Sequence, residues 1–218
     1  MRKYLFWFTL IINSPIFGQN HNIGLIGGPS VNNINGNGRF ESTKSIPGYQ
    51  VGITYQLVQK NNWIYGIQIQ FAKRGFIENY TSKLLEQPDT SSFLVTNRYS
   101  FGYVSIPLSV GYSIGKSNSW SIHLGAIPSI LIDANTKSEF LKYKQNQNLT
   151  SKVNRHDLAG YIEFDWTKSL NEQWLIHSGL RYQKSIINLT SDSFWPSNKI
   201  KHLGYCLQFG LRYRLEKK

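Results

Sequence analysis

The sequence predicts an all-β fold, an eight-stranded antiparallel up-and-down transmembrane β-barrel with a filled lumen. Three features predict it: long segments in which apolar and polar side chains alternate, connections that are alternately short and long, and a tryptophan after each short connection. The alternation is unbroken from His202 to Leu215. Successive side chains of a strand point to opposite faces, so this segment has one apolar face and one face that carries Arg212 and Arg214. Long strands with an apolar outer face and a polar inner face are typical of barrels that cross a membrane.

Strand-like alternation, bounded by turn residues, recurs along the chain. The segments lie near residues 23–33, 48–58, 63–78, 99–114, 120–135, 157–170, 174–189 and 201–215. The short connections are residues 59–62, 115–119 and 171–173, and the long ones are residues 34–47, 79–98, 136–156 and 190–200. Outer-membrane barrels combine short periplasmic turns with long extracellular loops. The pattern therefore predicts a single domain in the bacterial outer membrane.

Each short connection is followed at once by a tryptophan, namely Trp63, Trp120 or Trp174. Indole is amphipathic and prefers the headgroup level of a membrane. We therefore expect these three residues to form an aromatic girdle at one rim of the barrel. The alternative is that they fill the mouth of a soluble barrel, as in lipocalins.

Composition and the N-terminus agree with an exported barrel. Charged residues make up 17% of the chain, below the roughly 25% of an average soluble domain. The mean hydropathy of −0.34 argues against a bundle of membrane helices. Residues 1–19 combine Arg2 and Lys3 with a short apolar run and the small residue Gly18, a pattern typical of a cleaved signal peptide. We expect the barrel domain at residues 20–218. Cys206 is the single cysteine, which excludes an intramolecular disulfide.

Four motifs carry a resemblance to a known family. They are FAKRGF at residues 71–76, YVSIPLSVGYSI at 103–114, GLRYQKSIINL at 179–189 and LGYCLQFGLRYRL at 203–215. Together with the glycine-rich first strand, they resemble the small outer-membrane β-barrel proteins of Bacteroidota that are often called PorT-like. This resemblance implies the barrel fold and a role in protein secretion across the outer membrane.

Several charged residues fall at inward-facing positions of the expected strands. Eight strands enclose an interior that side chains just fill, and charges far from water must be paired and hydrogen-bonded. We therefore expect Glu163 and Asp165 to form a lumen ion-pair network with Arg181 and Arg212. The alternative is a path for protons or ions, which requires a continuous wet channel.

A barrel enzyme that hydrolyses lipid or peptide at its outer rim is the competing class of function. Such an enzyme needs a histidine together with a carboxylate and a hydroxyl to activate a nucleophile. No spacing in the sequence forces a triad, so we expect no catalytic residue, no metal site and no cofactor, and we expect His123 and His177 to be interior packing residues. The candidates near the long-connection rim are Asp133, His156, Asp157, Asp192, Ser138, Ser151, Ser191 and Ser193.

Basic residues gather in the third long connection: Lys137, Lys142, Lys144, Lys152 and Arg155. Basic side chains mixed with aromatic ones can bind a polyanion, and at a cell surface the nearest polyanion is lipopolysaccharide. The alternative is a solvated, mobile loop. In the fourth long connection, residues 194–196 (Phe-Trp-Pro) are a candidate adhesive tip.

These observations predict a non-catalytic outer-membrane barrel that acts as a scaffold, an adhesion module, or a secretion or assembly factor. Its long loops are expected to bind a partner. The expected partners are outer-membrane lipid and lipopolysaccharide, and a secretion-system or surface protein. We expect no nucleic-acid partner, and we expect a monomer.

Overall fold

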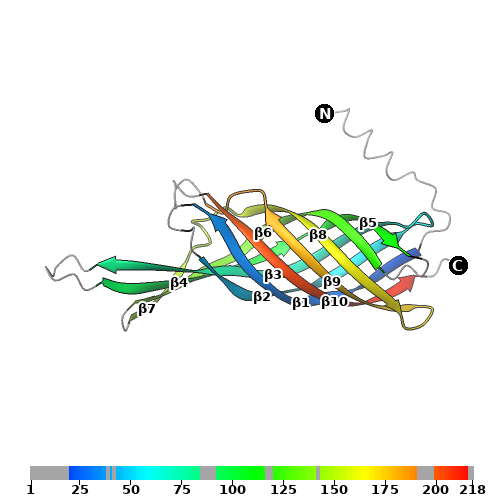
Figure 1. Ribbon diagram of the computed structural model, residues 1–218, viewed down its shortest axis with the longest axis horizontal. Coiled ribbons are helices and arrows are strands. Elements are labelled where there is room, and N and C mark those ends of the chain that lie inside the picture. Colours follow the sequence, from blue (N-terminus) through cyan, green and yellow to red (C-terminus); the bar gives the residue numbers. More distant parts are fainter. Residues whose placement is uncertain are drawn as a thin grey trace, which may run out of the picture.

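The described part of the chain consists of ten β-strands in one antiparallel sheet that closes into a barrel (Figure 1). The computed structural model describes residues 20–37, 40, 43–83, 92–115, 120–140, 143–190 and 199–215. Within these residues, no helix is long and apolar enough to cross a membrane. The expected signal peptide, residues 1–19, lies outside them. The strands are β1 (Asn20–Gly36), β2 (Thr43–Val58), β3 (Trp63–Lys83), β4 (Ser92–Ser105), β5 (Leu108–Ile114), β6 (Trp120–Phe140), β7 (Tyr143–Asn148), β8 (His156–Ser169), β9 (Trp174–Ser185) and β10 (Ile200–Leu215).

The barrel closes because β1 pairs with both β2 and β10. From β1 the ring runs through β2 and β3 to β4 and β5, and then through β6, β8 and β9 to β10. All of these pairs are antiparallel. The all-β antiparallel barrel that the sequence predicts is therefore confirmed.

The fourth expected strand is divided into β4 and β5 at Ile106 and Pro107. Proline has no N–H to donate to a ladder, so it interrupts a strand. Both halves nevertheless pair with β3 and β6. The amide of Ile106 donates to the carbonyl of Pro128 at 2.9 Å, and the carbonyl of Pro107 accepts from Gln68 at 2.9 Å. The wall between β3 and β6 is thus continuous across the break.

Three long connections that the sequence predicts as loops, residues 34–47, 79–98 and 136–156, are largely strand, so that prediction is wrong. Residues 78–83 of β3, 92–97 of β4, 136–140 of β6 and the whole of β7 pair side by side. We call these four segments the arm; it projects from one end of the barrel (Figure 1). Most arm side chains are polar on both faces, so the alternation that marks a strand in sequence is missing. Backbone pairing with a neighbour is what continues these strands.

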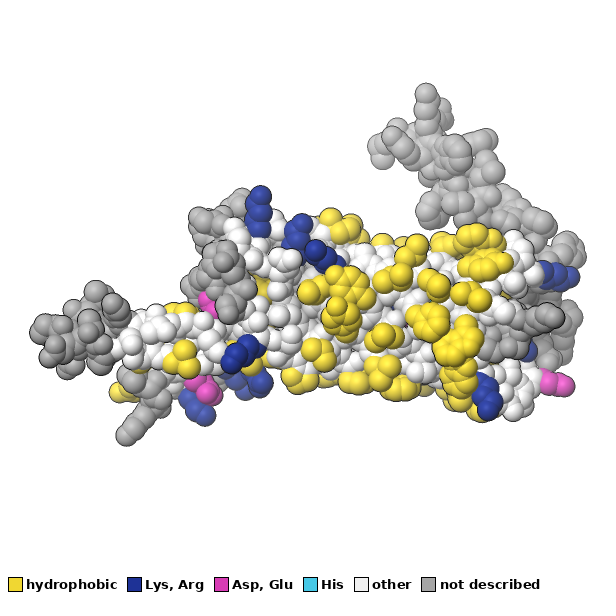
Figure 2. All heavy atoms as spheres, in the orientation of Figure 1, with side chains coloured by type: hydrophobic (Ala, Val, Ile, Leu, Met, Phe, Trp, Pro, Cys, Tyr) yellow, Lys and Arg dark blue, Asp and Glu magenta, His cyan; other side chains and the backbone are white. Residues whose placement is uncertain are grey.

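The outer face of the ring is apolar over most of its height. Along β10, Tyr205, Leu207, Phe209 and Leu211 are between 40% and 54% exposed. Figure 2 shows such side chains as a yellow band on the face in view, with Lys and Arg side chains gathered toward its ends. Soluble proteins rarely expose a continuous apolar surface of this extent, whereas a lipid-facing barrel wall requires one.

The three tryptophans lie on the outer face at the short-turn end, and not in the mouth of the barrel. Trp63, Trp120 and Trp174 begin β3, β6 and β9 and are 41%, 46% and 39% exposed. Each indole contacts an aromatic ring of a neighbouring strand, with ring centroids 5.0–5.6 Å apart. The side chain of Asn171 accepts from the Trp174 amide at 2.7 Å and thereby fixes the turn before β9.

The opposite end of the barrel carries an apolar cluster. Leu149, Val153 and Leu189 lie in the connections between strands and are 0%, 5% and 4% exposed. They pack with Phe76 and Phe101, which point inward from β3 and β4. Residues from the long connections therefore cover this end of the interior with apolar side chains.

The position of Phe209 in the band gives a depth-dependent prediction. Phe209 lies midway along the apolar face of β10, whereas Leu215 lies at its short-turn end. We expect Phe209→Arg to lower the free energy of unfolding by about 2–4 kcal/mol and Leu215→Arg by about 0–1 kcal/mol. Denaturant unfolding in phospholipid vesicles measures both values. Equal effects of the two substitutions would contradict the lipid-facing register.

Candidate functional site

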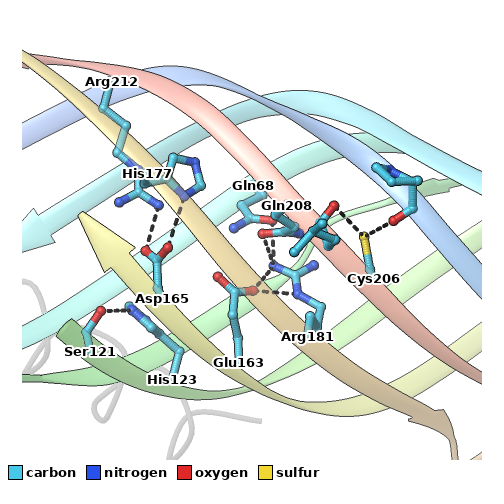
Figure 3. A network of polar contacts seen from close by, with 12 residues as sticks. Gln68, Ser121, His123, Glu163, Asp165, His177, Arg181, Cys206, Gln208 and Arg212 are labelled. Atoms are coloured by element: carbon cyan, nitrogen blue, oxygen red, sulfur yellow. Dashed lines mark hydrogen bonds and ion pairs between the residues drawn. The ribbon is translucent and has the colours of Figure 1, made fainter. Parts of the chain in front are cut away.

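The barrel interior holds ion pairs, and the first centres on Arg181 of β9. Its Nε atom donates to Oε2 of Glu163 on the neighbouring strand β8 at 2.6 Å. Its Nη2 atom donates to Oε1 of Gln68 at 3.0 Å, and Gln68 belongs to β3 on the far side of the ring. The guanidinium also lies over the ring of Tyr161, 4.3 Å from its centroid. Arg181 is fully buried, and these contacts join opposite walls of the barrel (Figure 3).

Gln208 of β10 completes this group. In the orientation that gives each amide atom a complementary partner, its nitrogen donates to Oε2 of Glu163 at 3.3 Å and its oxygen accepts from Nη2 of Arg181 at 3.1 Å. The same oxygen accepts from the side chain of Gln50 on β2. Three strands besides β9, namely β3, β8 and β10, therefore supply polar partners to a single buried guanidinium, and Gln50 of β2 extends the group through Gln208.

The second ion pair lies closer to the short-turn end. Asp165 accepts from Nη2 of Arg212 at 3.1 Å through Oδ2, while its Oδ1 atom lies 3.1 Å from Nδ1 of His177. Arg212 also donates to the hydroxyl of Thr167 at 3.4 Å. Figure 3 shows the carboxylate of Asp165 between the imidazole of His177 and the guanidinium of Arg212. His123 is buried nearby with its Nε2 atom 2.8 Å from the hydroxyl of Ser121.

A third group joins β3, β8 and β9 nearer to the long-connection end. Arg74 donates from Nη1 to Oδ2 of Asp157 at 2.9 Å, and the hydroxyl of Ser185 donates to the same oxygen at 2.9 Å. The hydroxyl of Tyr103 lies 3.1 Å from Nε2 of His202, which links β4 to β10. All of these side chains are at most 7% exposed.

Glycines on neighbouring strands make room for the large interior side chains. A Cβ atom on Gly210 would meet the ring of His177, and one on Gly111 would meet the ring of His123. Cys206 is buried in the same wall, and its Sγ atom lies 3.4 Å from the carbonyl oxygen of Pro29. The interior thus combines large polar side chains with adjacent glycines, which is how a narrow barrel accommodates them.

A family comparison agrees with the lipid-facing wall and the polar interior. The family model described as "Outer membrane protein beta-barrel domain" matches residues 17–218. The chain belongs to this family. Membership of this family places the chain in the bacterial outer membrane.

The chain is also similar to solved bacterial surface and outer-membrane proteins, at low sequence identity. Ail, the attachment invasion locus protein of Yersinia pestis, is 14% identical over 89% of this chain and 98% of its own, with a TM-score of 0.44. Neisserial surface protein A is 11% identical over 91% and 99%, with a TM-score of 0.47. OprG from Pseudomonas aeruginosa is 15% identical over 91% and 97%, with a TM-score of 0.42. Among curated proteins, no sequence matches the chain.

The four residues expected to form the lumen network of this outer-membrane barrel come together as two separate pairs, Glu163 with Arg181 and Asp165 with Arg212. The pair of Arg74 and Asp157 was missed by sequence reasoning. Its signal was present, because Asp157 has the same inward parity along β8 as Glu163 and Asp165. The parity of a residue in its strand tells whether its side chain faces the lumen or the lipid. It does not tell which residue that side chain contacts across the lumen.

The candidates for catalysis do not assemble within the described residues. His156 is exposed at the start of β8 and has no hydrogen bond or ion pair there, whereas Asp157 points inward to Arg74. Asp133 accepts from the side chain of Asn135 at 3.1 Å. Asp192, Ser191 and Ser193 lie outside the described residues. In the part of the chain that the structure describes, no group of three or more His, Cys, Asp or Glu side chains could hold a metal ion.

The basic residues expected in one loop are distributed over different elements. Lys137 lies on β6 opposite Arg98 of β4, and Lys144 lies on β7, 3.4 Å from Glu139. Lys152 and Arg155 lie between β7 and β8, and Lys142 is outside the described residues, as are the candidate tip residues 194–196. The β6–β7 hairpin therefore keeps Lys137 and Lys144 as diagonal neighbours on one face, whereas Lys152 and Arg155 lie outside the arm.

Removing a carboxylate from the interior should leave a buried arginine without its ion-pair partner. We expect Glu163→Ala to lower the free energy of unfolding by about 3–5 kcal/mol, because Arg181 then keeps a desolvated charge without its ion-pair partner. Glu139→Ala, which breaks the exposed pair with Lys144, should cost roughly 0–1 kcal/mol. Urea unfolding followed by gel mobility measures both. Equal midpoints for Glu163→Ala and the parent chain would mean that water solvates this site.

Proposed function

We propose that this protein is a non-catalytic outer-membrane barrel whose arm binds a partner outside the cell. The observation that carries the proposal is the arm itself. A membrane-spanning strand needs about 9–11 residues, whereas β3 and β6 have 21 residues each. The surplus in these strands forms a paired sheet at the end with the long connections, which is the extracellular end in barrels of this kind.

The inner face of the arm is hollowed and carries both aromatic and amide side chains. Tyr80, Phe93, Asn97, Phe140 and Gln145 line a cavity of about 430 Å³. They share one face because they fall on a single parity of β3, β4, β6 and β7. A cavity of this size with aromatic walls and a few oriented polar groups is typical of a binding site. Among the residues that the structure describes, no charged side chain lines it, which favours recognition by shape and hydrogen bonds over attraction to a polyanion.

The interior supports a scaffold rather than a channel. Ion pairs and amides connect opposite walls, and apolar side chains cover the long-connection end. At the short-turn end, Arg212, Arg214 and their neighbours line a cavity of about 80 Å³. That volume holds about two or three water molecules. These contacts favour a lumen that side chains fill.

The PorT-like motifs support a finer proposal, in which the partner of the arm is a component of protein secretion across the outer membrane. The signal peptide expected at residues 1–19 would deliver the chain to that membrane. The enzyme alternative gains no support from the described rim, where His156 and Asp157 face opposite sides of the wall.

Shortening the arm should abolish partner binding without unfolding the barrel. Replacing residues 79–96 by an Asn-Gly turn leaves the pair of Glu78 and Asn97 to close the hairpin. Affinity capture from native outer membranes should recover a partner with the full chain and lose it with the shortened chain. Recovery of the same proteins by both chains would contradict the role of the arm.

A point variant sharpens this test, because Tyr80 faces the hollow and Thr81 faces away from it. We expect Tyr80→Ala to weaken capture and Thr81→Ala to leave it unchanged. Equal loss in both variants would mean that the arm contributes stability rather than recognition. Capture of secretion-system subunits would establish the finer proposal, and capture of an unrelated surface protein would overturn it.

We expect the full chain to conduct no steady ion current in a planar lipid bilayer. The reason is that the contacts of Arg181 with Gln68 and of Arg74 with Asp157 cross the lumen, which favours an interior without a continuous aqueous path. Single-channel recording at neutral pH measures this. Regular conductance steps that increase with salt concentration would contradict it and would favour the ion-path alternative.

A further inference from the structure

A hollow interrupts the lipid-facing wall where β8, β9 and β10 approach the long-connection end. It has a volume of about 440 Å³, and its apolar lining includes Ile162, Tyr182 and Ile186. Its floor is Gly160, where an added Cβ atom would meet nothing within 4 Å. The packing of the barrel does not require a glycine at this position. The missing side chain opens a depression of the size of a small-ligand site on a surface that faces lipid.

Two lysines, Lys184 and Lys201, border this hollow. Lys184 lies directly opposite Gly160 on one side and Leu203 on the other. Lys201 is two residues beyond Leu203, so it is the diagonal neighbour of Lys184 on the same outer face. Diagonal neighbours are about 7–8 Å apart, which lets two flexible ammonium groups reach one anion. Figure 2 shows Lys and Arg side chains at this end of the apolar band, over β9 and β10.

The two ammonium groups have no carboxylate partner among the residues that the structure describes. Two like charges on neighbouring positions repel each other, so an anion between them would stabilise the wall. Just below them, the rings of Tyr182 and Tyr205 contact each other with centroids 5.2 Å apart. Tyrosines of this kind lie at the level of lipid headgroups. The lysines are therefore placed at the height of a headgroup phosphate.

We propose that this hollow is a binding site for the lipid A moiety of lipopolysaccharide, with an acyl chain in the depression over Gly160 and a phosphate between Lys184 and Lys201. The occupant follows from the surroundings, because the hollow opens into the membrane and combines an apolar floor with a cationic edge. The leaflet follows from the orientation in the proposed function, on which this inference rests: the long-connection end faces outward, and the outer leaflet of this membrane is lipopolysaccharide. The site does not involve the arm.

The test is titration of the full chain, folded in neutral detergent micelles, with purified bisphosphoryl lipid A, followed by native mass spectrometry. We expect one tightly bound lipid A molecule per chain. Lys184→Gln with Lys201→Gln should weaken binding about 25-fold, from about fivefold for each lysine near an anionic lipid. Gly160→Leu, which fills the hollow, should weaken it about tenfold, equivalent to two methylene groups kept out of the site.

Matched controls separate the site from general effects of charge and bulk. Lys168→Gln removes a lysine at the opposite end of β8, and Ser178→Leu places a leucine elsewhere on the outer face of β9. Both should bind lipid A like the parent chain. A gel-mobility assay shows that each variant is folded, and the lysine variant keeps the test valid if Gly160→Leu does not fold.

Three results would overturn the site: equal affinity of the double lysine variant and the parent chain, equal weakening by Lys168→Gln, or equal binding of dephosphorylated lipid A. Tighter binding of phosphatidylglycerol than of lipid A would overturn the outer-leaflet occupant, and with it the orientation. The chain with residues 79–96 shortened should bind lipid A normally, so failure of the arm as a partner site would leave this inference standing.

Discussion

The ladder between β1 and β10 is the constraint on which the rest of the structure depends. It joins the first strand to the last, so within the described ring no strand edge is left open. In hydrocarbon an unpaired backbone N–H or C=O costs several kcal/mol, and closure is the way a sheet avoids that cost. Once the ring is closed, alternate side chains must face either lipid or a narrow interior. The apolar band outside and the polar groups inside both follow from this division, as Leu207 and Gln208 illustrate with 42% and 0% exposure.

A closed interior removes most of the water around every charged side chain that faces it. Arg181, Arg74 and Arg212 lose most of their hydration, and each is matched by a carboxylate on another strand. Buried ion pairs of this kind add little net stability, because desolvation offsets most of the attraction. Their effect is on specificity: a slip of one residue between two strands would turn the whole set of charges toward lipid. The contacts of Arg181 with Gln68 and of Arg74 with Asp157 extend this control across the lumen, where no backbone ladder reaches.

The two ends of the barrel differ because their strands end differently. At one end, short turns leave the tryptophans of β3, β6 and β9 at a common level on the outer face. At the other end, β3, β4 and β6 continue past the ring and pair with β7, while Leu149, Val153 and Leu189 fold inward over the interior. The short-turn end is therefore a uniform rim, and the long-connection end is an irregular surface with hollows. Both surfaces that we propose as binding sites lie at the long-connection end, one in the arm and one beside Lys184 and Lys201.

The sequence by itself determined the barrel, the face on which each side chain lies and the positions of the tryptophans, because a period of two residues survives wherever one face is apolar and the other polar. It also placed Glu163, Asp165, Arg181 and Arg212 on the inner face. Only the tertiary structure decided which carboxylate meets which arginine, since pairing across the lumen depends on strand tilt and on residues far apart in sequence. The strands of the arm could not be predicted from the sequence for a different reason. Both faces of the arm are largely polar, so its strands show no alternation of apolar and polar residues. The hollow over Gly160 also leaves no pattern in the sequence, because it is formed by three strands that meet only in the folded ring.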